Sequence, residues 1–253
     1  MKRDQIGVQL YTLREMAAKD FDATLGAVAK MGYSGVEFAG FHGHSAADVR
    51  GMLDKYGLKA FSAHVPIDQF ENDIESVVSD MQTVGAPWVV IPFVSPEDRS
   101  PAFFADLSAK MNAWASRLKE AGIRLGYHNH DFEFTMTAED GRTIFETLLS
   151  ITDPDLVSFE LDLFWAAVGG YEPDQVMRQY PDRITLVHLK DGKQLERGKD
   201  LPFGEGALDW GAILSAAREI GVQYYITEQD NPNPDDPAGD VETALRNAER
   251  VAD

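Results

Sequence analysis

Two histidines stand two residues apart in a segment rich in carboxylates and aromatic rings, residues 127–134 with the sequence YHNHDFEF. The residues just before it, 122–126, are typical of a β-strand. Because side chains alternate between the two faces of a strand, we expect His128 and His130 to point the same way. Imidazole groups bind metals and transfer protons near neutral pH. The segment therefore predicts a metal site or a proton-transfer pocket.

The elements that must position this segment alternate between strand-like and helix-like runs, without a linker rich in proline, serine or glycine. Asp20, Ser45 and Asp209 each precede a helix-like run and are expected to cap it. Gly32 and Gly57 follow two of these runs and are expected to end them. The predicted strands comprise residues 6–11, 33–38, 58–64, 88–91, 122–126 with the histidine segment, 157–162, 184–190 and 224–228. The predicted helices comprise residues 21–31, 46–56, 69–84, 102–121, 142–150, 173–180, 210–220 and 241–251.

Strict alternation of strands and helices implies parallel strands joined by crossover helices. Eight units of about thirty residues fit a closed barrel, so the sequence predicts the α/β class and a single (β/α)8 TIM barrel domain over residues 1–253. An open doubly wound sheet is the alternative. The glycine-rich dinucleotide-binding turn that would favour such a sheet is absent after the first predicted strand.

The composition excludes several kinds of partner. The net charge is −19, from 42 acidic and 23 basic residues, which disfavours nucleic acid and anionic membranes because both bind basic surfaces. The chain has no cysteine, so disulfides, thiolate zinc sites and cysteine nucleophiles are excluded. Residues 1–5 include no hydrophobic signal region, and the longest apolar run, 88–94, is too short to span a bilayer. We expect a cytoplasmic protein, which could form a homo-oligomer.

Polar and ionisable residues gather at the carboxyl ends of the predicted strands, while the strand interiors are mostly apolar. In a barrel of this type the chemistry takes place at those ends. We therefore expect these residues to share one pocket. Seven of the eight strand ends carry such residues: Gln9, Tyr11, Glu37, His64, His128, His130, Glu160, Asp162, His188, Lys190 and Glu228. The end of the fourth predicted strand carries Pro92 and Phe93 instead.

Four of these residues, on predicted strands five to eight, form a mixed oxygen and nitrogen ligand set: His128, Asp162, His188 and Glu228. Such a set suits one divalent ion, Mn²⁺, Zn²⁺, Co²⁺ or Mg²⁺. A coordination position left for water or substrate would make the site catalytic. Three of these residues also have a structural alternative. His188 could be a hydrogen-bonded core histidine, Asp162 a cap for the next turn, and Glu228 a solvated loop charge.

Several short segments carry a resemblance to a known family: IGVQLYTLR (6–14), GVEF (35–38), YHNH (127–130), LD (161–162), VHLKD (187–191) and GEG (204–206). In this order and spacing they resemble the sugar phosphate isomerase/epimerase group of the xylose isomerase-like TIM barrel superfamily, over nearly the whole chain. The resemblance implies a divalent metal held by Glu, Asp, His and Glu from strands five to eight. Asp162, His188 and Glu228 match three of these ligands, whereas His128 stands where the epimerases carry a glutamate.

The resemblance also implies proton abstraction next to a carbonyl group, with a metal that polarises the ketone. We expect a metal-dependent isomerase or epimerase acting on a keto-sugar or related polyol. The alternative is an inosose-type dehydratase, because the Tyr-His-x-His pattern is similar to that branch. The catalytic candidates are Glu228 as ligand and base, His130 and His64 as acid or base, and Lys190 as oxyanion partner. The substrate-binding candidates are Gln9, Tyr11, Glu37, Phe93 and Trp165.

The glycine-flanked Glu205 follows the seventh predicted strand, where barrels often bind phosphate. A carboxylate at this position would repel a phosphate, so we expect a neutral sugar, keto-sugar or cyclitol. Two rival functions remain. An apurinic-site endonuclease would need a basic surface for DNA, which the net charge disfavours. A non-catalytic sugar-binding barrel would keep the aromatic residues but would have no need of the metal ligands.

Overall fold

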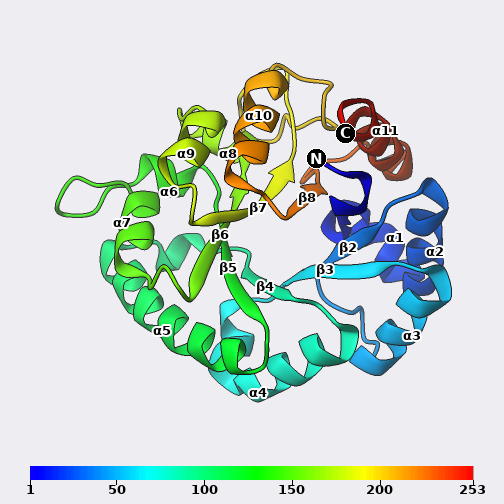
Figure 1. The fold of residues 1–253 in the computed structure, drawn as a ribbon, viewed down its shortest axis with the longest axis horizontal. Coiled ribbons are helices and arrows are strands. Elements are labelled where there is room, and N and C mark those ends of the chain that lie inside the picture. The colour runs from blue at the N-terminus through cyan, green and yellow to red at the C-terminus, as the bar shows by residue number, and fades with distance from the viewer. Residues whose placement is uncertain (253) are drawn as a thin grey trace.

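Eight parallel strands close into a barrel, in which neighbouring strands follow one another along the chain and the last pairs with the first. The computed structural model describes residues 1–252, and Figure 1 shows the strands ringed by helices. The predicted fold class, a single (β/α)8 barrel, is confirmed. The strands are β1 (Ile6–Gln9), β2 (Gly35–Phe38), β3 (Lys59–His64), β4 (Trp88–Ile91), β5 (Arg124–His128), β6 (Val157–Asp162), β7 (Ile184–Leu189) and β8 (Tyr224–Thr227).

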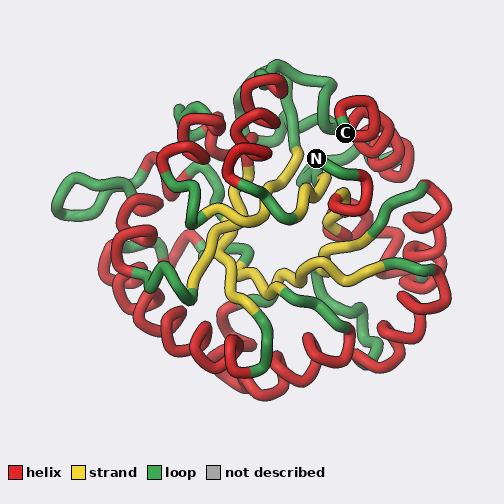
Figure 2. Tube along the Cα trace, in the orientation of Figure 1, coloured by secondary structure: helices red, strands yellow, loops and turns green. Residues whose placement is uncertain are grey.

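Helices cover the outside of the barrel, as the red coils around the yellow strands in Figure 2 show. The longer ones are α2 (Phe21–Met31), α3 (Ala46–Tyr56), α4 (Ile67–Val84), α5 (Pro101–Glu120), α7 (Ile144–Ile151), α9 (Pro173–Gln179), α10 (Trp210–Ile220) and α11 (Pro237–Val251). The short ones are α1 (Arg14–Lys19), α6 (Phe132–Thr135) and α8 (Leu163–Val168), with 3-10 turns η1 (Arg3–Gln5), η2 (Leu10–Leu13) and η3 (Pro96–Asp98). None of the helices in residues 1–252 is long and apolar enough to cross a membrane.

The predicted helix signals are confirmed. The side chain of Asp20 accepts a hydrogen bond from the backbone of the first turn of α2, and Ser45 and Asp209 do the same for α3 and α10. Gly32 and Gly57 adopt positive φ angles of 107° and 70° directly after α2 and α3. That conformation ends a helix and favours glycine over residues with a side chain.

Some predicted boundaries were wrong. Strand β5 ends at His128, so His130 lies in the loop that follows rather than on the strand. The sequence also did not predict α1, α6 or α8, which are too short to show a helical period. Helix α8 is entirely apolar in sequence and therefore lacks the polar face that marks longer helices. The predicted domain end at residue 253 lies outside the described residues.

The amino-terminal end of the barrel is filled by an aromatic stack. The ring of Phe61 stacks on Tyr224, with 4.1 Å between the ring centroids. Phe61 is the extra residue where the pairing of β2 with β3 shifts by one. Its ring occupies the space that side chains on β1 and β2 would otherwise need. A Cβ atom added at Gly7 or Gly35 would lie 2.7 or 2.6 Å from this ring. The two glycines therefore make room for the stack.

The carboxyl ends of the strands bring the predicted site residues side by side. In the ladder between β5 and β6, His128 pairs with Glu160, and between β6 and β7, Asp162 pairs with His188. The register shifts just before Glu37 and just before Glu160. Such bulges re-aim side chains at strand ends and are common beside active sites.

Candidate active site

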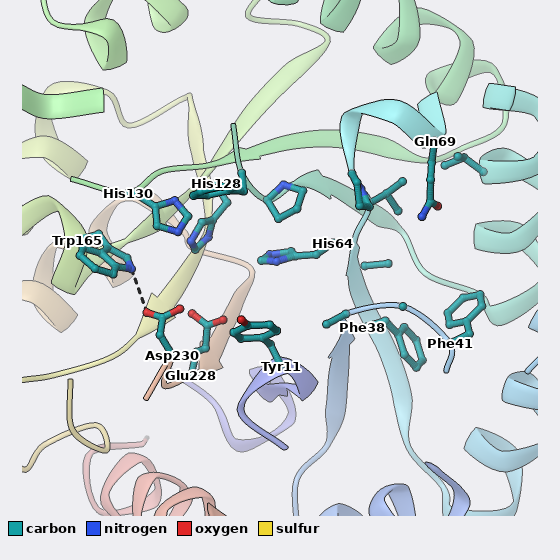
Figure 3. Close-up of a pocket in the computed structure, with 18 of the residues that line it drawn as sticks. Tyr11, Phe38, Phe41, His64, Gln69, His128, His130, Trp165, Glu228 and Asp230 are labelled. Atoms are coloured by element: carbon teal, nitrogen blue, oxygen red, sulfur yellow. Dashed lines mark hydrogen bonds between the residues drawn. The ribbon is translucent and has the colours of Figure 1, made fainter. Parts of the chain in front are cut away.

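A cavity of about 900 Å³ opens at the carboxyl ends of the strands. Figure 3 shows the carboxylates of Glu228 and Asp230 beside Tyr11 on one side of this cavity, with Phe38 and Phe41 beyond His64. Among the polar and aromatic residues that line it are Tyr11, His64, Phe93, Arg99, His128, His130, Asp131, Phe132, Trp165, Arg197, Glu228 and Asp230. Pockets that bind small ligands have volumes of roughly 300–1,000 Å³, so this cavity is large enough for a sugar or cyclitol.

The four predicted metal ligands converge at one point. One donor atom from each of His128, Asp162, His188 and Glu228 lies within 4.8 Å of the other three. His188 Nδ1 lies 2.9 Å from Glu228 Oε2 and 3.9 Å from Asp162 Oδ2, and His128 Nε2 lies 3.8 Å from Asp162 Oδ2. Ligands about 2.1 Å from a common metal ion have separations of this size. All four side chains are buried.

Asp162 uses its two carboxylate oxygens differently. Oδ1 accepts a hydrogen bond of 2.9 Å from the backbone nitrogen of Trp165 and thereby caps α8. Oδ2 is buried without an aligned hydrogen-bond donor, although the ammonium of Lys190 lies 2.9 Å away. The structural alternative from the sequence, a capping aspartate, is therefore correct for one oxygen. The other oxygen faces the ligand set.

Two further carboxylates, Glu37 and Glu160, lie behind the histidines of the ligand set. His188 turns Nδ1 toward Glu228, and its Nε2 lies 2.8 Å from Glu37 Oε1 and 3.1 Å from Glu160 Oε2. His128 turns Nε2 toward Asp162, and its Nδ1 lies 3.0 Å from Glu160 Oε2. In a metal-binding histidine, a carboxylate that is hydrogen-bonded to the ring nitrogen facing away from the metal fixes the orientation and tautomer of the ring. The arrangement gives both histidines this support.

The ammonium of Lys190 lies among three carboxylates. It is 2.9 Å from Asp162, 2.8 Å from Glu228 and 2.6 Å from Asp230, and the side chain is fully buried. Burial opposes the charge, but Asp162, Asp230 and Glu228 outweigh it and raise the pKa of Lys190 well above its usual value. The lysine does not line the cavity. Direct contact with a substrate oxyanion, as predicted from the sequence, is therefore not favoured by its position.

His64 and His130 line the same cavity in opposite charge states. Burial disfavours the imidazolium of His64, but the carboxylates of Glu37 and Glu160 outweigh burial and raise the pKa of His64 to about 10. Burial and the charge of Lys190 lower the pKa of His130 to about 3. At neutral pH the first ring is therefore a proton donor. The second is neutral, and its Nδ1 is buried without a partner.

The predicted substrate-binding residues separate into two groups. Tyr11, Phe93 and Trp165 line the cavity. Gln9 and Glu37 are fully buried beneath it, where Gln9 donates a hydrogen bond of 2.7 Å to Glu37 and Ser62 occupies the second oxygen of Glu37. With its oxygens occupied, Glu37 is not available to bind substrate hydroxyls in this arrangement. We correct its predicted role to the support of His188.

The loop of residues 204–206 does not line the cavity. Glu205 accepts a hydrogen bond of 2.8 Å from Asn247 of α11. Gly206 packs against Asp191 so closely that an added Cβ atom would lie 2.0 Å from the carboxylate. A glycine is therefore needed here to let the backbone pass close to the Asp191 carboxylate. The expectation of a neutral substrate, which assumed that Glu205 faces the pocket, loses its basis.

Several residues with charged side chains at or near the cavity were not among the sequence predictions, and Asp230, Glu133 and Arg99 are three of them. Asp230 lies two residues beyond Glu228, and continued alternation along that strand end would have indicated it. Glu133 is fully buried and binds the hydroxyl of Tyr127 and the backbone nitrogen of His130. Arg99 lies in the loop between β4 and α5, and no pattern in the sequence signals it.

Glu133 makes the stability of the protein depend on pH. Burial, against the hydrogen bonds from Tyr127 and His130, raises its pKa from an ordinary 4.5 to about 7. The folded state then holds a proton that the unfolded state has lost, so stability falls as pH rises from about 4.5 to about 7. At about 1.4 kcal/mol per pH unit, this difference corresponds to about 3 kcal/mol. We expect Glu133→Gln to flatten this part of the profile, as urea unfolding between pH 5 and 8 would measure. An unchanged slope in the variant would contradict this assignment.

Comparisons with known proteins agree with the barrel fold. Residues 25–250 match the model of the xylose isomerase-like TIM barrel family. An inosose dehydratase from Geobacillus kaustophilus is 24% identical over 252 aligned residues, which cover 84% of this chain and 80% of that protein. The rhizopine catabolism protein MocC from Rhizobium meliloti is also 24% identical, over 90% of this chain and 80% of its own.

Solved structures give the same result. A sugar phosphate isomerase/epimerase from Parabacteroides distasonis superposes with a TM-score of 0.84 at 26% identity, covering 99% of this chain and 95% of that chain. The match to the family model covers most of the chain, and the resemblance predicted from the short motifs is confirmed. The chain belongs to the xylose isomerase-like TIM barrel family.

Proposed function

We propose that this protein is a divalent-metal-dependent dehydratase that removes water from a keto-cyclitol or related keto-sugar. The observation that carries the proposal is the convergence of His128, Asp162, His188 and Glu228 beneath a cavity that also holds a cationic and a neutral histidine. The names of the relatives from Geobacillus kaustophilus and other bacteria favour dehydration over the isomerisation that the sequence led us to expect. We place this activity in the cytoplasm.

The ligand set fits a divalent ion. It offers two carboxylates and two imidazoles without a soft sulfur donor, which is the chemistry that Mn²⁺, Zn²⁺ or Co²⁺ prefers. The buried Oδ2 of Asp162, which lacks an aligned donor, supports this assignment. When bound, the ion would supply Lewis acidity to a substrate carbonyl. The side chains of the cavity would carry out the proton transfers.

The proposed elimination needs a base, an acid and a ketone held between them. Removal of the proton from the carbon next to the carbonyl (the α-carbon) leaves an enolate. The enolate then expels the hydroxyl group from the following carbon (the β-carbon), which forms a double bond conjugated with the ketone. Glu228 or His130 would take the proton, because both line the cavity. The buried Nδ1 and the low pKa of His130 make that atom a weak base in the substrate-free protein. His64 would donate the proton that converts the departing hydroxide to water. Trp165 and Phe93 would pack against the ring.

The direct test uses the metal-loaded protein and an inosose in deuterated water. We expect loss of one water, detected as a new ultraviolet absorbance of a conjugated ketone, and no reaction after chelation. Exchange of the α-proton with formation of an isomeric ketone, without loss of water, would instead establish the isomerase reading, which the similarity to the Parabacteroides distasonis protein supports. If the protein bound no metal and catalysed neither reaction, the remaining function would be that of a non-catalytic sugar-binding barrel.

The carboxylates behind the histidines give a second test of the metal site. We expect Glu160→Gln to weaken Mn²⁺ binding by about 10- to 100-fold, because its carboxylate contacts His128 and His188 at their outer nitrogens. Calorimetric titration of the metal-free protein measures this change.

Glu133→Gln is the matched control for that variant. Glu133 is equally buried near the same strand ends but contacts Tyr127 and the backbone of His130 instead of the ligand histidines. We expect its metal affinity to equal that of the wild type. An equal loss in both variants would show a general effect of buried carboxylates rather than support of the two histidines.

A further inference from the structure

The charges that line the cavity are unevenly distributed. Glu228 and Asp230 lie together at one side, where Figure 3 shows their carboxylates adjacent. The same cavity is lined by two arginines, Arg99 between β4 and α5 and Arg197 in the loop after β7. The carboxylates suit a cation. The arginines have no place in the proposed chemistry of a neutral ketone.

Arg99 is held in a fixed orientation. Its Nε donates a hydrogen bond of 3.0 Å to the carbonyl oxygen of Val94. The guanidinium carbon lies 3.5 Å from the ring centroid of Phe132, which is buried, and 4.9 Å from that of Phe93. Stacking on aromatic rings is a favourable position for a guanidinium group. The backbone bond and the two rings together restrain the plane of the group.

The two terminal nitrogens of Arg99 are available to a ligand. Within residues 1–252, neither has a hydrogen bond or ion pair to another protein group. Of the carboxylates that act on the pKa of Arg99, Glu133 has the largest effect, and it is fully buried and bound to Tyr127. Arg197 contrasts with this, because its Nε lies 2.8 Å from the carboxylate of Asp131. The chain has 42 acidic residues, yet Arg99 pairs with none of those that the structure describes. Its terminal N–H groups can therefore donate hydrogen bonds to a ligand in the cavity.

We propose that Arg99 binds an anionic substituent of the substrate, a carboxylate or a phosphate, and that Arg197 adds a second positive charge nearby. The planar fork of a guanidinium group matches both anions through two parallel hydrogen bonds. Repulsion from Glu228 and Asp230 would keep the anion away from those two carboxylates. The substrate would therefore bind in one orientation, with its ketone toward the ligand set. This inference rests on the proposed function only in placing the substrate in the same cavity.

Binding measurements test the inference without turnover. D-fructose, D-fructose 6-phosphate and 5-keto-D-gluconate are a neutral, a phosphorylated and a carboxylated keto-sugar, and each is titrated calorimetrically with and without Mn²⁺. We expect at least one of the two anions to bind about tenfold or more tightly than fructose, with a preference that declines as salt rises. Whichever anion is preferred identifies the group that the site takes.

The arginine is then changed. We expect Arg99→Gln to remove the preference while leaving the affinity for fructose unchanged, and Arg99→Lys to keep part of it. Arg142→Gln is the matched control, because Arg142 also lies on a loop but pairs with Asp140 and does not line the cavity. An equal affinity of the wild type for all three sugars, or a preference retained in Arg99→Gln, overturns the inference. Failure of the proposed dehydration would appear separately, as absence of product.

Discussion

Asp162→Asn is expected to lose stoichiometric divalent metal and to lower turnover by about 10²–10³-fold, while the barrel stays folded. The asparagine keeps an oxygen that can accept the hydrogen bond from the backbone nitrogen of Trp165, so α8 remains capped. It removes the negative charge of Oδ2, the buried oxygen that faces the other ligands. Loss of one preorganised electrostatic group in an active site has an effect of this size. Elemental analysis of the purified protein and the rate of product formation measure the two losses.

Asp209→Asn separates ligation from capping. Asp209 caps α10 through the same kind of hydrogen bond, to the backbone of Ala212, and does not line the cavity. We expect this variant to keep its metal and its activity. If Asp162→Asn also retained both, Asp162 would be a capping residue only, and the proposed metal site would be misplaced.

The second large effect is expected at the buried ammonium group. Lys190→Met removes the positive charge that lies within 2.9 Å of Asp162, Glu228 and Asp230. Breaking a buried ion pair by removing one partner costs about 3–5 kcal/mol, because the remaining charge is left uncompensated. We expect a loss of this size in the free energy of unfolding of the metal-free protein. Added divalent metal should recover part of it, since Asp162 and Glu228 are also proposed ligands.

Lys110→Met provides the control for that loss. Lys110 also contacts two carboxylates, those of Glu71 and Asp106, at 2.8 Å each, but its side chain is 42% exposed. Surface ion pairs contribute at most about 1 kcal/mol. Urea unfolding of both variants, with chelator and with Mn²⁺, measures the difference. A small loss for Lys190→Met in chelator would mean that the three carboxylates are neutral or rearranged without the lysine.

The fold was predictable because its signals are local. The caps at Asp20, Ser45 and Asp209 and the glycines that end α2 and α3 each act within a few residues. The strand ends were less predictable because side chains change the course of the backbone there. Strand β1 was expected to run to Tyr11, but the side chain of Gln9 accepts a hydrogen bond from the nitrogen of Tyr11 and turns the chain into η2.

The proposed ligand set was predictable in its composition and not in its surroundings. Alternation along a strand places His128 or His188 inside the barrel, but it does not give the depth at which a side chain lies. Glu37 and Lys190 are therefore of the expected residue type, at the expected strand ends, and yet lie beneath the cavity. The proposed role of Arg99 depends partly on the ring of Phe132, which comes from α6 and is distant in the sequence. Such contacts between distant segments leave no trace in the spacing of residues.

The aromatic stack of Phe61 and Tyr224 at the amino-terminal end affects how molecules enter and leave the barrel. Because that end is filled, whatever enters the polar centre of the barrel must leave through the same opening. Water displaced by an arriving molecule, the molecule itself and anything formed from it would share one route. An anionic group bound at Arg99 would then slow the departure of molecules that lie deeper in the cavity. Arg99 would therefore affect the residence time of a bound molecule as well as its affinity.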